Sequence, residues 1–123
     1  MAGTLTISTL SDGTNSTSAT NCISGSAKAW CRYNGQSQTI ANSYNISSVT
    51  YGGTGNYKFN FTNAMSTSNY SVSAFVQSSG IVSTLLPDVQ DGFTTTYASF
   101  RCIQASNSTY YNTPIFTMTV FSS

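Results

Sequence analysis

The sequence predicts an all-β fold, a single antiparallel β-sandwich of jelly-roll-like type with seven to nine short strands. Apolar and polar residues alternate with a period of two along most of the chain, as in strands with one buried face. Turn sequences such as Asn34-Gly35 and Gly52–Gly55 separate these stretches. No apolar stripe persists at helical spacing, and β-branched and aromatic residues are frequent. These three observations favour sheets over helices.

The 123 residues suffice for one domain, which we divide into an N-terminal strand and polar arm (1–26) and a β-sandwich domain (27–123). Leu5–Leu10 alternates and predicts an opening strand. Ser11–Ser26 consists mainly of Ser, Thr, Asn and Gly with almost no apolar anchor, and predicts an extended arm or a long loop. Ala27–Tyr33 alternates again and predicts the first strand of the sandwich.

The same alternation predicts the later strands. The clearest is Asn56–Phe61, which places its aromatic side chains on one face and its polar side chains on the other. The other predicted strands are Gln38–Ile40, one or two within Tyr44–Thr50, Tyr70–Gln77, Ile81–Leu86, one within Phe93–Gln104, and Ile115–Phe121.

The composition argues against catalysis. Charged residues make up 6% of the chain, histidine is absent, and the only carboxylate side chains are Asp12, Asp88 and Asp91. Acid–base catalysis near neutral pH needs groups that titrate there. We therefore expect a protein that is not an enzyme, with no catalytic residue, no cofactor and no metal.

The surface is expected to be neutral and rich in hydroxyl and amide groups, which favours self-association because charge repulsion is weak. The absence of a basic patch argues against nucleic-acid binding. The absence of a run of about 18 apolar residues argues against membrane insertion. The first residues, Met1-Ala2-Gly3, lack the features of a secretory signal.

The three cysteines, Cys22, Cys31 and Cys102, have no CxxC spacing and no histidine to complete a zinc site or to act as a base. We expect Cys31 and Cys102 to be small buried strand residues. Cys22 lies in a polar segment and is either a free thiol or the partner of one of the others.

Asp88 and Asp91 lie three residues apart and allow two interpretations. Two close carboxylates can bind calcium or act as a glycosidase pair. The favoured interpretation is a solvated turn that ends at Asp91-Gly92, because the spacing does not match a calcium loop.

The middle of the chain carries a combination of short motifs. They are GSAKAW (25–30), YNG (33–35), SYNISSVT (43–50), GTGNYKFNF (53–61), Ala64-Met65 and Asn69-Tyr70. Together they resemble a small domain of structural proteins from tailed bacteriophages, especially marine phages and those that infect cyanobacteria. The motif aromatics are expected to form the core because each contributes roughly 1.5–3 kcal/mol when buried. They are Trp30, Tyr33, Tyr44, Tyr57, Phe59, Phe61 and Tyr70.

The resemblance implies a virion component, as in tail fibres and in capsid or tail decorations, assembled in the host cytoplasm. It implies partners among other virion proteins and self-association, with a homotrimer expected because many fibre modules are trimers. The length of the chain, which starts at Met1, favours a decoration over a fibre shaft.

Two segments could bind other molecules. Late tyrosines and amides suit recognition of a host surface glycan, because an aromatic face packs on a sugar ring while amides bind hydroxyls; ordinary loop residues or a subunit interface are the alternative. These residues are Tyr97, Asn107, Tyr110, Tyr111 and Asn112. The polar arm Ser11–Ser26 either docks onto a neighbouring subunit or capsid protein, or is a disordered terminus.

Overall fold

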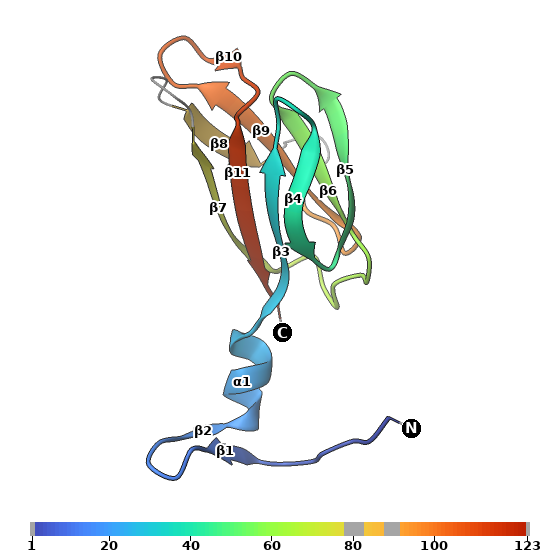
Figure 1. The fold of residues 1–123 in the computed structure, drawn as a ribbon, viewed down its shortest axis with the longest axis vertical. Coiled ribbons are helices and arrows are strands. Elements are labelled where there is room, and N and C mark those ends of the chain that lie inside the picture. Colours follow the sequence, from blue (N-terminus) through green and yellow to red (C-terminus); the bar gives the residue numbers. More distant parts are fainter. Residues whose placement is uncertain (1, 78–82, 88–91, 123) are drawn as a thin grey trace.

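The computed structural model describes residues 2–77, 83–87 and 92–122. Two antiparallel sheets pack face to face, and an N-terminal arm extends from one end of them (Figure 1). This architecture confirms the predicted all-β sandwich. The predicted pair Asp88 and Asp91, and the start of the strand predicted at Ile81, lie outside the described residues.

One sheet has four strands in the order β4-β3-β11-β7. Its central strands are β3 and β11, which pair so that Cys31 lies opposite Met118. The bounds are β3 Ala27–Asn34, β4 Thr39–Tyr44, β7 Ser71–Gln77 and β11 Ile115–Phe121.

The second sheet has the order β10-β9-β6-β5, with β8 also paired to β9. Its central strand β6 alternates between buried and half-buried residues, as the sequence predicts. The bounds are β5 Ile46–Gly53, β6 Asn56–Phe61, β8 Ser83–Pro87, β9 Tyr97–Gln104 and β10 Thr109–Tyr110.

Aromatic rings fill the space between the sheets. Phe59 is fully buried, with its ring centroid 4.8 Å from that of Phe116 and 5.8 Å from that of Tyr33. Most of these contacts are edge-to-face or tilted, which is the favoured geometry for aromatic pairs. The motif aromatics at the centre of this core are Tyr33, Tyr57, Phe59, Phe61 and Tyr70.

Two glycines allow close packing at one end of the sandwich, Gly35 between the two sheets and Gly55 within the sheet that contains β5, β6 and β9. Gly35 follows β3, and a methyl group there would overlap the Tyr57 hydroxyl. Gly55 has a φ of +69°, and a Cβ there would lie 2.8 Å from the amide nitrogen of Tyr111. A side chain at either position would therefore force the adjoining strands apart.

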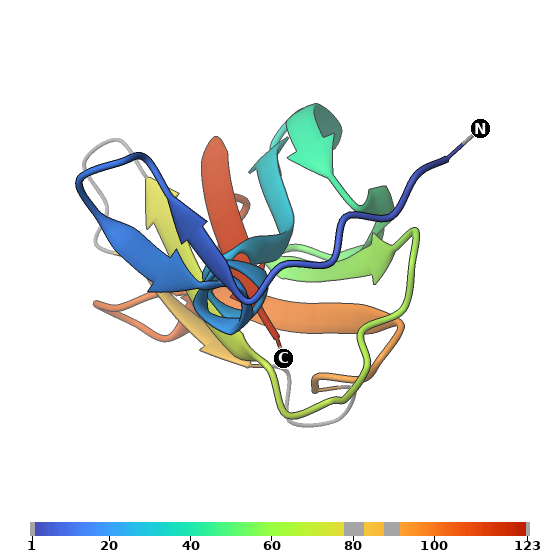
Figure 2. The same cartoon turned by 90° about the horizontal axis from the view of Figure 1, so that it is seen from below.

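The arm differs from the prediction of an opening strand followed by an extended segment. A short hairpin of β1 (Thr9–Ser11) and β2 (Ser16–Ser18) precedes a helix, α1 (Ala19–Gly25). The Ser18 side chain caps this helix by accepting a hydrogen bond from the Asn21 amide at 3.2 Å. Figure 2 shows α1 end-on beneath the sandwich, with the hairpin on one side of it and the N-terminal tail on the other.

The prediction that Trp30 and Tyr44 belong to the core is wrong. Trp30 is 37% exposed and Tyr44 is 57% exposed, and the two lie opposite each other on β3 and β4. Trp30 alternates with buried Ala29 and Cys31, so it must face away from the other sheet. Its aromatic character predicted burial, but no third layer covers that face among the described residues.

Candidate functional site

The late tyrosines and amides do not form one site. Tyr97 begins β9, whereas Tyr110 pairs with Ile103 near the other end of that strand. Six residues of strand place these positions about 20 Å apart. The Tyr97 ring lies 4.5 Å from the Lys58 ammonium nitrogen, a cation–π contact that the sequence analysis did not predict.

Asn112 is an internal hydrogen-bond centre. Its side-chain oxygen accepts hydrogen bonds from the Gly55 amide at 2.8 Å and from the Tyr57 hydroxyl at 2.9 Å. Its side-chain nitrogen donates to the Tyr51 hydroxyl at 3.1 Å. These bonds join Asn112 to the β5–β6 hairpin, so its amide has a structural role here.

The other late residues lie at the surface. Asn107 accepts a hydrogen bond from the Thr109 amide at 3.1 Å, which closes a local turn. The Tyr110 side chain is exposed, and its hydroxyl lies 3.4 Å from a guanidinium nitrogen of Arg101. Tyr111 is half-buried and its amide donates to the Cys102 carbonyl. Of the predicted set, Tyr110 presents the most accessible aromatic side chain.

The described residues contain no group of three His, Cys, Asp or Glu side chains that could hold a metal ion. Asp12, in the β1–β2 turn, accepts hydrogen bonds from the amides of Asn15 at 2.7 Å and Thr14 at 2.9 Å. These bonds lower its pKa, because they stabilise the ionised carboxylate. The geometry is that of a turn-closing aspartate.

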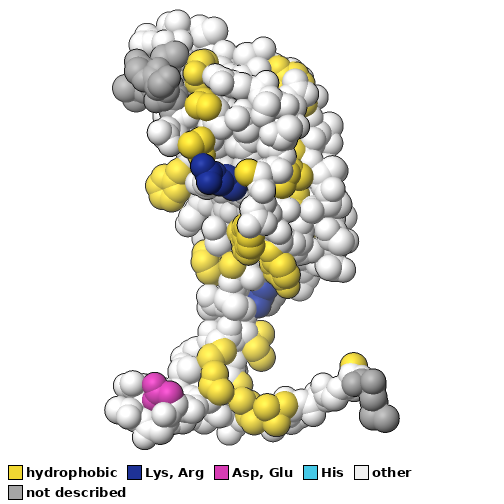
Figure 3. All heavy atoms as spheres, viewed as in Figure 1, with side chains coloured by type: hydrophobic (Ala, Val, Ile, Leu, Met, Phe, Trp, Pro, Cys, Tyr) yellow, Lys and Arg dark blue, Asp and Glu magenta, His cyan; other side chains and the backbone are white. Residues whose placement is uncertain are grey.

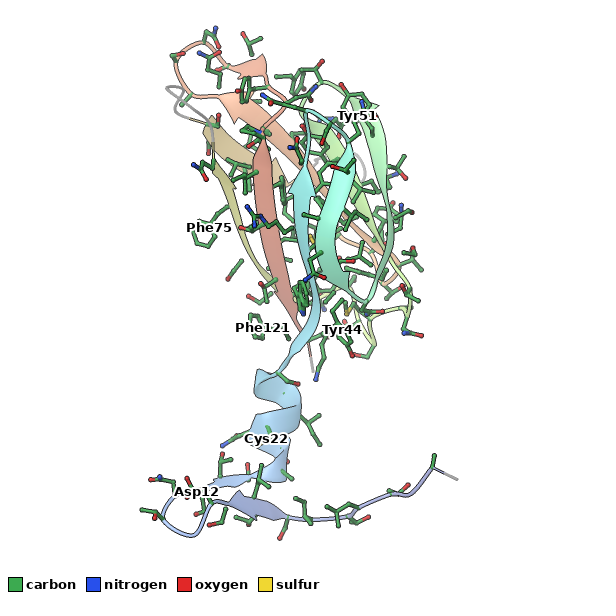
Figure 4. The ribbon with its side chains drawn as sticks, in the orientation of Figure 1. Asp12, Cys22, Tyr44, Tyr51, Phe75 and Phe121 are labelled. Atoms are coloured by element: carbon green, nitrogen blue, oxygen red, sulfur yellow. The ribbon has the colours of Figure 1, made fainter. Side chains whose placement is uncertain are left out.

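The three cysteines are all free thiols. Burial raises the pKa of Cys31 and of Cys102 to about 11, since a thiolate is poorly stabilised inside the sandwich. Both are therefore protonated and unreactive near neutral pH. Cys22 lies on α1 and is exposed (Figure 4).

The outer face of the four-stranded sheet carries an aromatic patch, which we call the outer patch and define as Trp30, Tyr44, Phe75 and Phe121. Phe75 is the most exposed member, at 73%, and projects from β7 (Figure 4). Phe121 and Tyr44 lie at the end of the sheet nearest the arm (Figure 4). Large exposed aromatic side chains on one face are typical of a contact surface.

The N-terminal arm carries a second apolar surface. Leu5, Ile7, Leu10 and Ile23 are all exposed, and they line a shallow groove of about 340 Å³ together with Cys22. Figure 3 shows apolar side chains along the arm and again over the lower part of the sandwich. The alternation of Leu5–Leu10, which predicts a strand, is the sequence signal for this surface.

A polar groove of about 270 Å³ lies where the arm meets the sandwich. Its lining includes the exposed ring of Tyr44 and the side chains of Asn45 and Asn63. The Asn45 amide group is already engaged, since it accepts from the Asn63 amide and donates to the Lys28 carbonyl.

A scan against protein-family models, a search of curated proteins and a search of solved structures each found no match. In the part of the chain that the structure describes, no helix is long and apolar enough to cross a membrane.

Proposed function

We propose that this protein is a non-enzymatic structural protein of a virion that self-associates as a homotrimer and decorates the capsid or tail. The observation that carries the proposal is the pair of uncovered apolar surfaces, the arm and the outer patch, on a chain with only 6% charged residues. Surfaces of this kind are typical of proteins that work in an assembly.

The chemistry of the described residues supports a non-enzymatic role. The buried thiols have raised pKa values, and Asp12 is fully engaged in closing a turn. A fold that works through neutral hydrogen bonds and packing needs no titratable group in a cleft.

The virion assignment rests on the resemblance of the motif segments to phage structural proteins. These segments form β3 and the β5–β6 hairpin, where they supply buried rings and a glycine turn. The partners in this proposal are further copies of the chain and other virion proteins.

Mass spectrometry and immunogold labelling of purified particles test the virion assignment. We expect the chain in intact particles at many copies, with label on the capsid or the tail. A chain that is found only in the lysate and never in particles would contradict the assignment.

A second candidate function is binding of a host glycan, favoured by the exposed ring of Tyr44 above the polar groove. Glycan-array binding of the full chain tests it, with Tyr44→Ala and Tyr110→Ala as a pair of variants. Loss of binding in only one variant locates the site. An array without signal contradicts this candidate.

A further inference from the structure

We infer that the arm of one copy, residues 2–26, packs on the outer patch of a second copy. The inference deepens the proposed self-association and rests on it. Four observations support it. The apolar side chains of the arm are exposed, the outer patch is not covered by other described residues, the chain holds its own arm away from its own patch, and the charges near the two surfaces are opposite.

The arm has secondary structure but no core of its own. None of residues 2–26 is buried, and Leu5 is 82% exposed and Ile23 64% exposed. A hairpin of three-residue strands and a helix of seven residues are both too short to be stable in water without packing. The arm therefore requires an apolar surface to cover its leucine and isoleucine side chains.

The outer patch offers such a surface. Trp30 pairs with Tyr44 on one side and with Thr119 on the other, so that two rings and a threonine form one row across three strands. Phe121 lies at the arm end of the sheet (Figure 4). Phe75 projects from β7 two residues beyond Ser73, which continues the row on that strand. No other described residues form a layer that covers the patch.

The arm does not reach the outer patch of its own chain. α1 leads into β3 and places the hairpin beyond the end of the sandwich (Figures 1 and 2). The Lys28 ammonium group donates hydrogen bonds to the Ile23 carbonyl and to the Ser26 hydroxyl. These two bonds connect the end of α1 to the start of β3. A second copy supplies the missing surface in the required number, one patch for each arm.

The charges of the two surfaces are opposite. Asp12 in the arm is the one acidic residue that the structure describes, and Arg32 is exposed on the strand that carries Trp30. Like charges therefore do not oppose the contact, and one pair of opposite charges favours it.

Trp30 is the only tryptophan of the chain and lies in the patch, so its fluorescence reports on the contact directly. The full-length chain is diluted in steps while the emission maximum, acrylamide quenching and sedimentation are recorded. We expect the associated form to show blue-shifted emission and weaker quenching, because the arm of another copy covers the indole ring.

The decisive variant is the double substitution Leu10→Ser and Ile23→Ser in the arm, with Leu86→Ser as the matched control. Leu86 is 45% exposed on β8, in the other sheet. All three side chains are exposed, so folding is not expected to change, and circular dichroism checks it. We expect the arm variant to weaken association at least about tenfold, and the control to match the wild type.

The outcomes separate this inference from the proposed self-association. A wild-type chain that stays monomeric at all concentrations overturns both. An oligomer in which Trp30 emission and quenching do not change overturns the inference alone. The inference is also overturned if the arm variant associates as strongly as the wild type. Weaker association of the arm variant, with Trp30 exposed and the control unchanged, supports it.

Discussion

Asn112 illustrates how single neutral residues hold this fold together. Its amide group bonds to Gly55, Tyr57 and Tyr51, three positions on the β5–β6 hairpin. Burial of polar groups is favourable only when they are paired, and here one side chain satisfies three of them. Asn112 was predicted to contact a glycan, but its side chain has a structural role.

The substitution Asn112→Ala is expected to lower the free energy of unfolding by about 1–3 kcal/mol, because it removes the partner of the Gly55 amide and one partner of the Tyr57 hydroxyl, which also bonds to the Thr113 backbone. Urea unfolding measures the change. Asn107→Ala is the matched control, since Asn107 makes one local bond in an exposed turn. Equal effects of the two substitutions would contradict the role of Asn112.

The three cysteines should differ in their reactivity toward a thiol reagent. In the native protein, at concentrations where the chains are dissociated and the arm groove is uncovered, a thiol reagent at pH 8 should modify Cys22 rapidly. It should leave Cys31 and Cys102 unmodified, because burial both shields them and raises the pKa of each to about 11. Mass spectrometry should count one label per native chain and three per unfolded chain. Rapid labelling of all three in the native protein would show that the core is open.

Most strands of the sandwich were predictable from the sequence, whereas the structure of the arm was not. The strand β10 was also missed, and β4 extends to Tyr44, beyond the predicted Gln38–Ile40. Alternation predicted Asn56–Phe61 and Ile115–Phe121 with the bounds that β6 and β11 have. The helix α1 was missed because Ala19–Gly25 carries no apolar stripe, and its main signal is the capping serine. Trp30 and Tyr44 were misplaced because alternation defines two faces of a strand without saying which aromatic faces remain uncovered.

The stability of the helix α1 should depend on association of the chain. It has seven residues, none of them buried, so we expect it to be largely unfolded when the chain is dilute and to form as the chain associates. NMR chemical shifts of residues 19–25, recorded over a range of concentrations, measure its population. Substitution of the cap, Ser18→Ala, should reduce the helix population further, by an amount that corresponds to about 1 kcal/mol. A helix that is fully formed in the monomer would contradict this account.

For the molecule as a whole, the buried thiols and the Tyr70 hydroxyl predict how stability depends on alkaline pH. The folded protein raises the pKa of Cys31 and Cys102 from 9.0 to about 11, and that of Tyr70 from 10.0 to about 12. Between these values the folded state binds more protons than the unfolded state. The contribution of these groups to the free energy of unfolding should therefore be fully present below pH 9 and be lost as the pH rises from 9 to 12.

Urea unfolding at a series of pH values from 8 to 12 measures this alkaline loss. The variant Cys102→Ala should show a shallower loss between pH 9 and 11 than the wild type, while Cys22→Ser, which removes an exposed thiol, should keep the wild-type slope. A wild-type slope in Cys102→Ala would contradict the assignment of the loss to the buried thiol.

The molecule is thus a sandwich with few charged residues and two apolar regions that no other described residues cover, and self-association would cover both regions. Contacts between neutral faces are only weakly sensitive to salt, whereas contacts between charged faces weaken as ionic strength rises.

Sedimentation equilibrium of the full-length chain at low salt and at about 1 M salt tests this central claim most directly, because it measures both the assembly and the nature of its contacts. The account predicts an oligomer of three times the 13.1 kDa chain mass at both ionic strengths. A monomer at all concentrations, or an oligomer that dissociates at high salt, would contradict it.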